Sequence, residues 1–239
     1  MGTIDHIDAF KSKLSQGDVD DFCRKYNIPG HLLPEAPGVN DTIRNAPEGK
    51  IGVYTRFFEL GNFRIPLSLF LLRVLEYFQI HLSQLSVLAA CRISHFEILC
   101  RVHGGTPTVS LFRKFYYAGV HNGWMTLEKR RGPKSLQVPV CYTAVLDSVK
   151  HWKDRFFFVK RTIFPIAVPW FDKVSVDRDP SPSDADIDQE LLRLLNTKRA
   201  PFQKYPDVFL NVIGLSQNWD DETGGCPASL FLYICYFCL

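Results

Sequence analysis

The sequence predicts an α+β fold, built from a mainly helical core, a small antiparallel sheet and two docked carboxy-terminal helices. Apolar residues recur at helical spacing in three consecutive stretches between about residues 66 and 117. Short runs rich in β-branched and aromatic residues follow between residues 123 and 159, and two short amphipathic stretches lie nearer the carboxyl end. The 239 residues are 46% hydrophobic and 22% charged, a composition that excludes collagen, coiled coil and wholesale disorder.

Three regions are expected along the chain. Residues 1–48 form an arm with one or two helical turns and then a loop rich in proline and glycine, a composition that prefers turns. Residues 49–222 form the main domain. Residues 223–239 contain the nearly apolar run GGCPASLFLYICYFCL, which is too short to span a membrane and is expected to lie outside the fold.

The three core helices follow from apolar spacing and from signals at their ends. The first helix, about 66–80, is expected to have Pro66 in its first turn, where the missing N–H is harmless, and to be buried on most sides. The second helix runs over about 84–103 and is ended by two glycines. The third begins with a threonine and a proline and covers about 106–117.

Three strands are expected after the helices. The runs 123–127, 136–143 and 155–159 are short and are bounded by glycine, proline and charged residues, which is typical of a small antiparallel sheet. Pro139 cannot donate a ladder hydrogen bond, so the second run is expected at an edge.

The last third of the domain is expected to begin with a solvated linker. Residues 177–186, DRDPSPSDAD, are acidic and contain proline, which favours exposed chain. The stretches 187–196 and 206–215 each have a narrow apolar face. Because such short helices are unstable alone, we expect both to dock on the body.

The residues indicate no catalytic site, cofactor site or metal site. Seven cysteines, an odd number, and an amino terminus without an apolar signal segment favour reduced thiols and an intracellular location, nucleus or cytoplasm. The chain has no phosphate-binding glycine loop and no small-molecule site is indicated. Asp220, Asp221 and Glu222 are adjacent and point in different directions, whereas a two-metal site needs carboxylates that converge. A metal-dependent transposase or nuclease therefore stays a remote alternative to a non-enzymatic protein.

Charge is distributed unevenly along the chain. Residues 101–161 contain twelve lysines and arginines against three acidic residues, a balance of +9, whereas the preceding part has −1 and the following part −5. A basic segment interleaved with aromatic residues is typical of binding to DNA or RNA phosphates, with exposed rings stacking on bases. The candidate nucleic-acid-binding residues are Arg113, Lys114, Lys129, Arg130, Arg131, Lys134, Lys153 and Arg155, and the candidate rings are Tyr116, Tyr117, Trp124 and Trp152.

The same charges also permit a second interpretation. The basic segment and the acidic residues 172–190 can neutralise each other within the fold, because separation in sequence need not survive folding. The apolar helix about 66–80 would then serve self-association or a partner protein. One contiguous basic face favours the nucleic-acid hypothesis, and neutralisation by residues 172–190 favours the interaction module.

Four stretches of the sequence carry a family resemblance. They are GKIGVYTRFFELGNFRIPLSLFLLRVLEYFQIHLSQLSV (49–87), SHFEILCRVHGGTPTVSLFRKFY (94–116), NGWMTLEKR (122–130) and HWKDRFFFVK (151–160). Together they resemble the plant gypsy-type transposon domain, also labelled as a gypsy-type transposase, over about residues 9–221. The run after Thr223 does not resemble the family.

The resemblance implies an origin in a long-terminal-repeat retrotransposon and little about chemistry. No catalytic residue of the family is established that could be assigned to a position here. We therefore expect a retrotransposon-derived, non-catalytic protein, gag-like or associated with nucleic acid, with an interaction or self-assembly module as the alternative.

Overall fold

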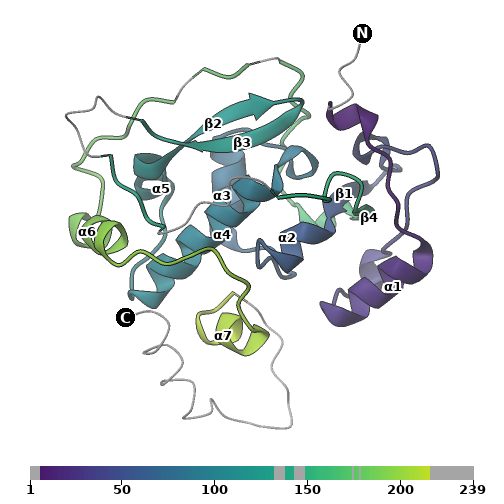
Figure 1. Ribbon diagram of the computed structural model, residues 1–239, viewed down its shortest axis with the longest axis horizontal. Coiled ribbons are helices and arrows are strands. Elements are labelled where there is room, and N and C mark those ends of the chain that lie inside the picture. Colours follow the sequence, from purple (N-terminus) through teal and green to yellow (C-terminus); the bar gives the residue numbers. More distant parts are fainter. Residues whose placement is uncertain (1–5, 132–137, 143–148, 174, 178, 216–239) are drawn as a thin grey trace.

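The computed structural model describes all residues except 1–5, 132–137, 143–148, 174, 178 and 216–239 (Figure 1). The described residues form seven α-helices, several short 3-10 turns and two antiparallel sheets of two strands each. The predicted α+β class is confirmed. A helix that could span a bilayer is absent from the described part of the chain. The predicted tail and the acidic triplet that precedes it lie outside the described residues.

Helix α4, Val87–Val102, is the centre of the core (Figure 1). Ser86 caps it, because the Ser86 hydroxyl accepts a hydrogen bond from the Ala89 N–H at 3.2 Å. Thirteen of its sixteen residues are buried, since other elements cover it on all sides. The prediction of a helix over 84–103 is therefore confirmed in position.

Helices α3, Leu69–Tyr77, and α5, Val109–Phe115, pack beside α4. Each begins later than predicted, because the cap is Ser68 in α3 and Thr108 in α5. The outer face of α3 is also less buried than expected, since the Leu69 residue is 61% exposed.

The third helix ends earlier than expected, because the chain enters a hairpin. Strand β2, Tyr116–His121, pairs with β3, Trp124–Lys129, through a two-residue turn at Asn122 and Gly123. Both turn residues have positive φ, 51° and 86°, as the preferred hairpin turn requires. The Asn-Gly dipeptide is a strong hairpin signal that the prediction of a helix to Tyr117 overlooked.

The second sheet joins β1, Lys50–Tyr54, to β4, Phe156–Lys160. The expected single sheet is therefore two separate sheets. The expected strand 136–143 is wrong over its described residues, 138–142, where Tyr142 makes only an isolated parallel bridge to Ala200. Its Val140 N–H donates to the Asn196 side chain at 3.0 Å instead of to another strand.

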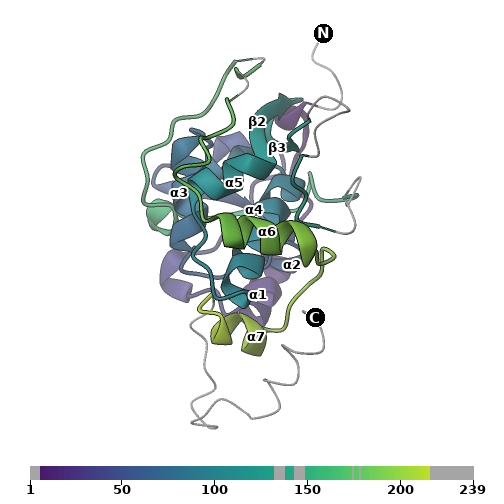
Figure 2. The ribbon, with the colours of Figure 1, turned by 90° about the vertical axis from the view of Figure 1, so that its left-hand side faces the viewer.

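The amino-terminal arm and the carboxy-terminal helices all pack on this body. Helix α1, Gln16–Lys25, has a capping box formed by Ser15 and contributes to the main hydrophobic core. Helix α6, Gln189–Thr197, buries Leu191 and Leu195 in that core. Helix α7, Asp207–Val212, packs against α4 through a smaller cluster at the lower edge of the molecule (Figure 2).

One glycine of β1 tests the packing of the second sheet. A Cβ atom on Gly52 would lie 2.4 Å from Ile43 Cγ1 and 3.1 Å from the Ile43 carbonyl oxygen. We expect Gly52→Ala to lower the free energy of unfolding by about 1–3 kcal/mol through overpacking. Gly30→Ala is the control, because no atom lies within 4 Å of its Cβ position. Urea unfolding curves that shift equally for both variants would contradict this account.

Candidate nucleic-acid interface

The hairpin brings three of the predicted basic residues together. Arg113 and Lys114 lie in the last turn of α5, and Arg130 directly follows β3. Because β2 continues from α5 and pairs with β3, the Arg130 N–H reaches the Phe115 carbonyl oxygen at 2.8 Å. Arg113 and Arg130, 17 positions apart in the sequence, thus become neighbours.

Two of these cations, Arg113 and Arg130, converge on one carboxylate from the acidic segment. Arg113 donates from Nε to Asp179 Oδ2 at 2.7 Å and from Nη2 to Oδ1 at 2.9 Å, a bidentate pair. Arg130 donates from Nη2 to Oδ2 at 3.0 Å and from Nη1 to the Asp179 carbonyl oxygen at 2.7 Å. The Tyr77 hydroxyl completes the arrangement by donating to Oδ1 at 3.0 Å. We call Arg113, Lys114 and Arg130 the basic cluster.

Burial makes these contacts stronger than ordinary surface ion pairs. The side chains of Arg130 and Asp179 are only 8% and 15% exposed. The hydrogen bonds that Arg113 donates to Asp179 raise the pKa of the Arg113 guanidinium. Burial, and next the hydrogen bond to Asp179, raises the pKa of the Tyr77 hydroxyl. Each group therefore keeps the protonated form that donates to Asp179.

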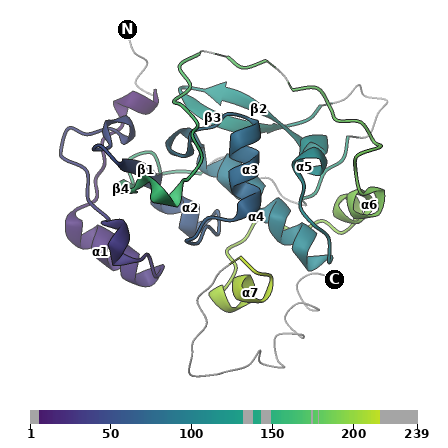
Figure 3. The ribbon, with the colours of Figure 1, turned by 180° about the vertical axis from the view of Figure 1, so that it is seen from behind.

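Lys114 extends the contact along the same acidic segment. Its Nζ donates to the Pro182 carbonyl oxygen at 2.6 Å and to Asp184 Oδ1 at 2.5 Å. A cavity of about 550 Å³ lies between the cluster and the segment, with Arg131 and Ser181 among the residues that line it. Residues 179–184 were predicted as part of a solvated linker, but here they contact the basic cluster. Figure 3 shows the chain between β4 and α6 passing near α5.

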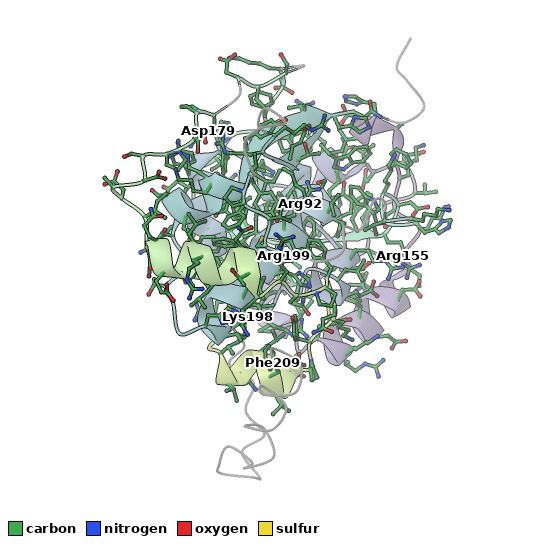
Figure 4. The ribbon with its side chains drawn as sticks, turned by 60° about the vertical axis from the view of Figure 1, so that its left-hand side comes forward. Arg92, Arg155, Asp179, Lys198, Arg199 and Phe209 are labelled. Carbon is green, nitrogen blue, oxygen red and sulfur yellow. The ribbon has the colours of Figure 1, made fainter. Side chains whose placement is uncertain are left out.

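Two of the other predicted basic residues, Lys153 and Arg155, have neighbours outside this cluster. Lys153 Nζ lies 4.7 and 4.8 Å from the ring centroids of Phe10 and Trp124. Arg155 is exposed near Asp18, whose pKa is lowered mainly by hydrogen bonds with Ser15 and less by the charge of Arg155. Figure 4 shows Arg155 and Asp179 on different sides of the molecule.

Three predicted basic residues remain. Lys129 is the last residue of β3, opposite Tyr116, and Arg131, two residues later, is exposed. Lys134 lies outside the described residues.

Most of the candidate rings are buried in the core and are not exposed for base stacking. Tyr116, Trp124 and Trp152 are all buried, and the Trp124 Nε1–H donates to the Tyr54 hydroxyl at 2.9 Å. Tyr117 is half-buried, and its hydroxyl donates to Glu128 at 2.9 Å. The stacking component of the expected interface therefore lacks exposed partners at these positions.

Buried thiols and imidazoles near α4 are structural. His95 Nδ1 lies 2.8 Å from the Cys91 carbonyl oxygen, and its Nε2 lies 2.8 Å from the Gln203 carbonyl oxygen and 2.9 Å from the Gln203 nitrogen. A neutral ring with hydrogen on Nδ1 donates to Cys91 and accepts from the Gln203 N–H, whereas a protonated ring would donate to both carbonyl oxygens. Burial also raises the pKa of the Cys91 thiol to about 12, which keeps it unreactive. Within the described ranges, no three potential ligands of the His, Cys, Asp and Glu types gather around one point.

Sequence reasoning missed the acidic partners of the interface. It allowed residues 172–190 to neutralise the basic segment, but it did not single out Asp179 and Asp184, and it treated Tyr77 only as part of a helix. Charge complementarity between 101–161 and 172–190 was the available signal, but it did not identify which residues would meet.

A comparison with known protein families gives a match to part of the chain. Residues 52–120 match the model of a family described as "Putative gypsy type transposon". The match covers most of β1 and continues through α2, Thr55–Glu59, and the three core helices almost to the end of β2. It confirms a gypsy-type transposon-related domain in this part of the chain. No curated protein and no solved structure matches the chain.

Proposed function

We propose that this chain, which carries a gypsy-type transposon-related domain, is a non-catalytic protein that binds nucleic-acid phosphates at the basic cluster. One observation supports the proposal above the others. Two guanidinium groups and a phenolic hydroxyl already converge on a single anionic group, the Asp179 carboxylate. Bidentate arginine pairs of this kind suit phosphate as well as carboxylate.

In this proposal the carboxylates of Asp179 and Asp184 occupy the places at the basic cluster that nucleic-acid phosphates would take, so they compete with nucleic acid for binding. Both are part of the same chain, so their effective concentration at the cluster is high. Nucleic acid must displace them, and the affinity of the intact chain is lowered accordingly.

The acidic segment has features that favour displacement. Ser181, Ser183 and Asp186 are exposed, and the Asp184 side chain is 78% exposed. The segment is anchored to the core at a distance from the cluster, where the Phe171 N–H donates to Gln84 at 2.7 Å and Ile187 is buried. Residues 179–186 can therefore leave the cluster while both anchors stay in place.

The second candidate, an interaction module, is favoured by the neutralisation of the basic cluster, because all three of its cations pair with residues of the acidic segment and Arg155 lies on a different side of the molecule. If the ion pairs are permanent, the cluster only fastens the acidic segment to the body, and partners bind elsewhere. The exposed Leu69 on the outer face of α3 is then the first place to test. Light scattering over a wide concentration range, with Leu69→Asp as the variant, measures self-association.

Removal of the competing carboxylates separates the two candidates. For Asp179→Asn with Asp184→Asn we expect the affinity for a single-stranded oligonucleotide to rise about tenfold or more, since a hydrogen bond to a charged group contributes roughly 1.5–3 kcal/mol. Fluorescence anisotropy at several salt concentrations measures the affinity, and binding should weaken as salt rises.

The control removes a charge from the same segment without removing these contacts. Asp186→Asn lowers the negative charge at an exposed position and should change the affinity little. An equal gain for Asp186→Asn would indicate nonspecific charge attraction. If the double variant stays unbound at low salt, the nucleic-acid proposal is wrong and the interaction module is favoured.

A further inference from the structure

Ser181 lies where three cations hold the backbone on both of its sides. Arg113 Nη2 and Arg130 Nη2 donate to the Pro180 carbonyl oxygen at 3.1 and 3.2 Å, directly before Ser181. Lys114 donates to the Pro182 carbonyl oxygen directly after it. Ser181 itself is exposed and lines the cavity of about 550 Å³.

We propose that Ser181 is a phosphorylation site and that its phosphate is received by the basic cluster and Arg131. Arg131 and Lys114 line the same cavity as Ser181, and Arg130 lines it too. A group attached to the Ser181 hydroxyl therefore has several cationic donors within its reach.

The two carboxylates that pair with the cluster differ in exposure. Asp179, which pairs with Arg113 and Arg130, is 15% exposed, whereas Asp184, which pairs with Lys114, is 78% exposed. A phosphoserine adds about −1.5 to −2 charge and three acceptor oxygens, and opposite an arginine cluster it forms new charge-assisted hydrogen bonds. The phosphate would thus tighten the contact between the acidic segment and the body.

The acidic segment also has the conformation and the sequence that a protein kinase needs in its substrate. Residues 179–183 are outside helices and strands, and Ser181 is followed by Pro182, as proline-directed kinases require. In the reaction the Ser181 oxygen attacks the γ-phosphorus of ATP and forms an O–P bond. The bond from that phosphorus to the β–γ bridging oxygen breaks, ADP leaves, and the hydroxyl proton passes to the kinase base.

The functional consequence rests on the proposed function. A phosphate held in cis at the cluster occupies the place that a nucleic-acid phosphate would take. Phosphorylation of Ser181 would therefore close the nucleic-acid site rather than open it.

Hydrogen exchange on the full chain tests the site itself. We expect a chain with phosphoserine genetically encoded at position 181 to exchange the amides of residues 181 and 183–187 about tenfold more slowly than the unmodified chain. Phosphoserine at Ser183 is the matched control. Ser183 is exposed, does not line the cavity and is not followed by proline, so the effect there should be smaller.

A second variant, Arg131→Gln, tests the phosphate contact at a position where the substitution should not disturb folding. Arg131 is exposed, so Arg131→Gln should preserve the fold while reducing the protection given by phosphoserine 181. Unchanged or faster exchange with phosphoserine 181 would overturn the proposal, as would protection that Ser183 reproduces in full.

Treatment with a proline-directed kinase and Mg-ATP tests whether the site can be modified. Mass spectrometry should place the phosphate on Ser181, with less incorporation in Pro182→Ala. Absence of phosphate at Ser181 would sink the modification. Oligonucleotide affinity of the same samples decides the proposed function separately, because protection without any nucleic-acid binding leaves the phosphate site valid and the proposed function wrong.

Discussion

Replacement of Phe96 with alanine is expected to lower the free energy of unfolding by about 3–5 kcal/mol. Phe96 lies in the middle of α4 and is fully buried. Its ring centroid is 5.5 Å from that of Phe70, 5.1 Å from Phe112 and 5.8 Å from Phe115. These rings belong to all three core helices, so truncation leaves a cavity that no single helix can fill by moving.

The control for this prediction is an apolar residue at the surface of the same core. Leu69→Ala, next to Phe70 in α3, should change the free energy of unfolding by no more than about 0.5 kcal/mol. Urea or guanidinium unfolding followed by circular dichroism compares the two variants. A loss below about 1.5 kcal/mol for Phe96→Ala would show that α4 is not packed as described.

Acidification is expected to destabilise the protein, mainly through His95. Burial lowers the pKa of His95 from 6.5 to about 4, although its hydrogen bonds with Gln203 and Cys91 partly oppose the shift. Between these two values the unfolded chain binds more protons than the folded chain, so stability rises with pH. The full stability is present above pH 6.5 and is lost as the pH falls toward 4.

The size of the effect follows from the shift. From pH 7.5 to pH 5, His95 alone should reduce the free energy of unfolding by about 2 kcal/mol. Burial, followed by the charge of Arg161, lowers the pKa of His81 to about 4 as well. His81 is only partly buried, so solvent screening makes its contribution smaller.

The comparison that isolates this effect uses His95→Gln across the same pH range. The variant should lose most of the dependence between pH 6.5 and 4, whereas His31→Gln, at an exposed position, should keep it. Glu97 acts in the opposite direction, because burial raises its pKa and its stability contribution is lost as the pH rises. Glu97 is present in both wild type and His95→Gln, so its contribution cancels when the stability curve of the variant is subtracted from that of the wild type. Parallel stability curves for wild type and His95→Gln would contradict the assignment of the pH dependence to His95.

Local signals accounted for the helical core and failed where two local preferences competed. The spacing of apolar residues predicted α4 and the approximate positions of α3 and α5. The hairpin was missed because the aromatic residues at the end of α5 continue into β2 without a break in hydrophobicity. At such a junction the Asn122-Gly123 turn was the stronger evidence.

For the candidate site, too, the composition of the sequence predicted the residues of interest but not the contacts between them. The sequence showed a basic segment and an acidic one, and it identified Arg113, Lys114 and Arg130 as residues of interest. It did not show that they would meet Asp179, because that contact spans 66 residues for Arg113 and depends on how the β2–β3 hairpin places Arg130. The expected aromatic stacking was misplaced for a similar reason, since a hydrophobic ring gains more from burial than from exposure.

The sequence by itself determined the class of the fold, its three core helices and the charge asymmetry, because these depend on periodicity, capping residues and composition. It also carried the gypsy-type resemblance that residues 52–120 confirm. Only the tertiary structure decided which charges face each other and which rings remain exposed. Ion pairs between distant segments require a particular packing of the chain, and formal charge summed along a sequence contains no information about that packing.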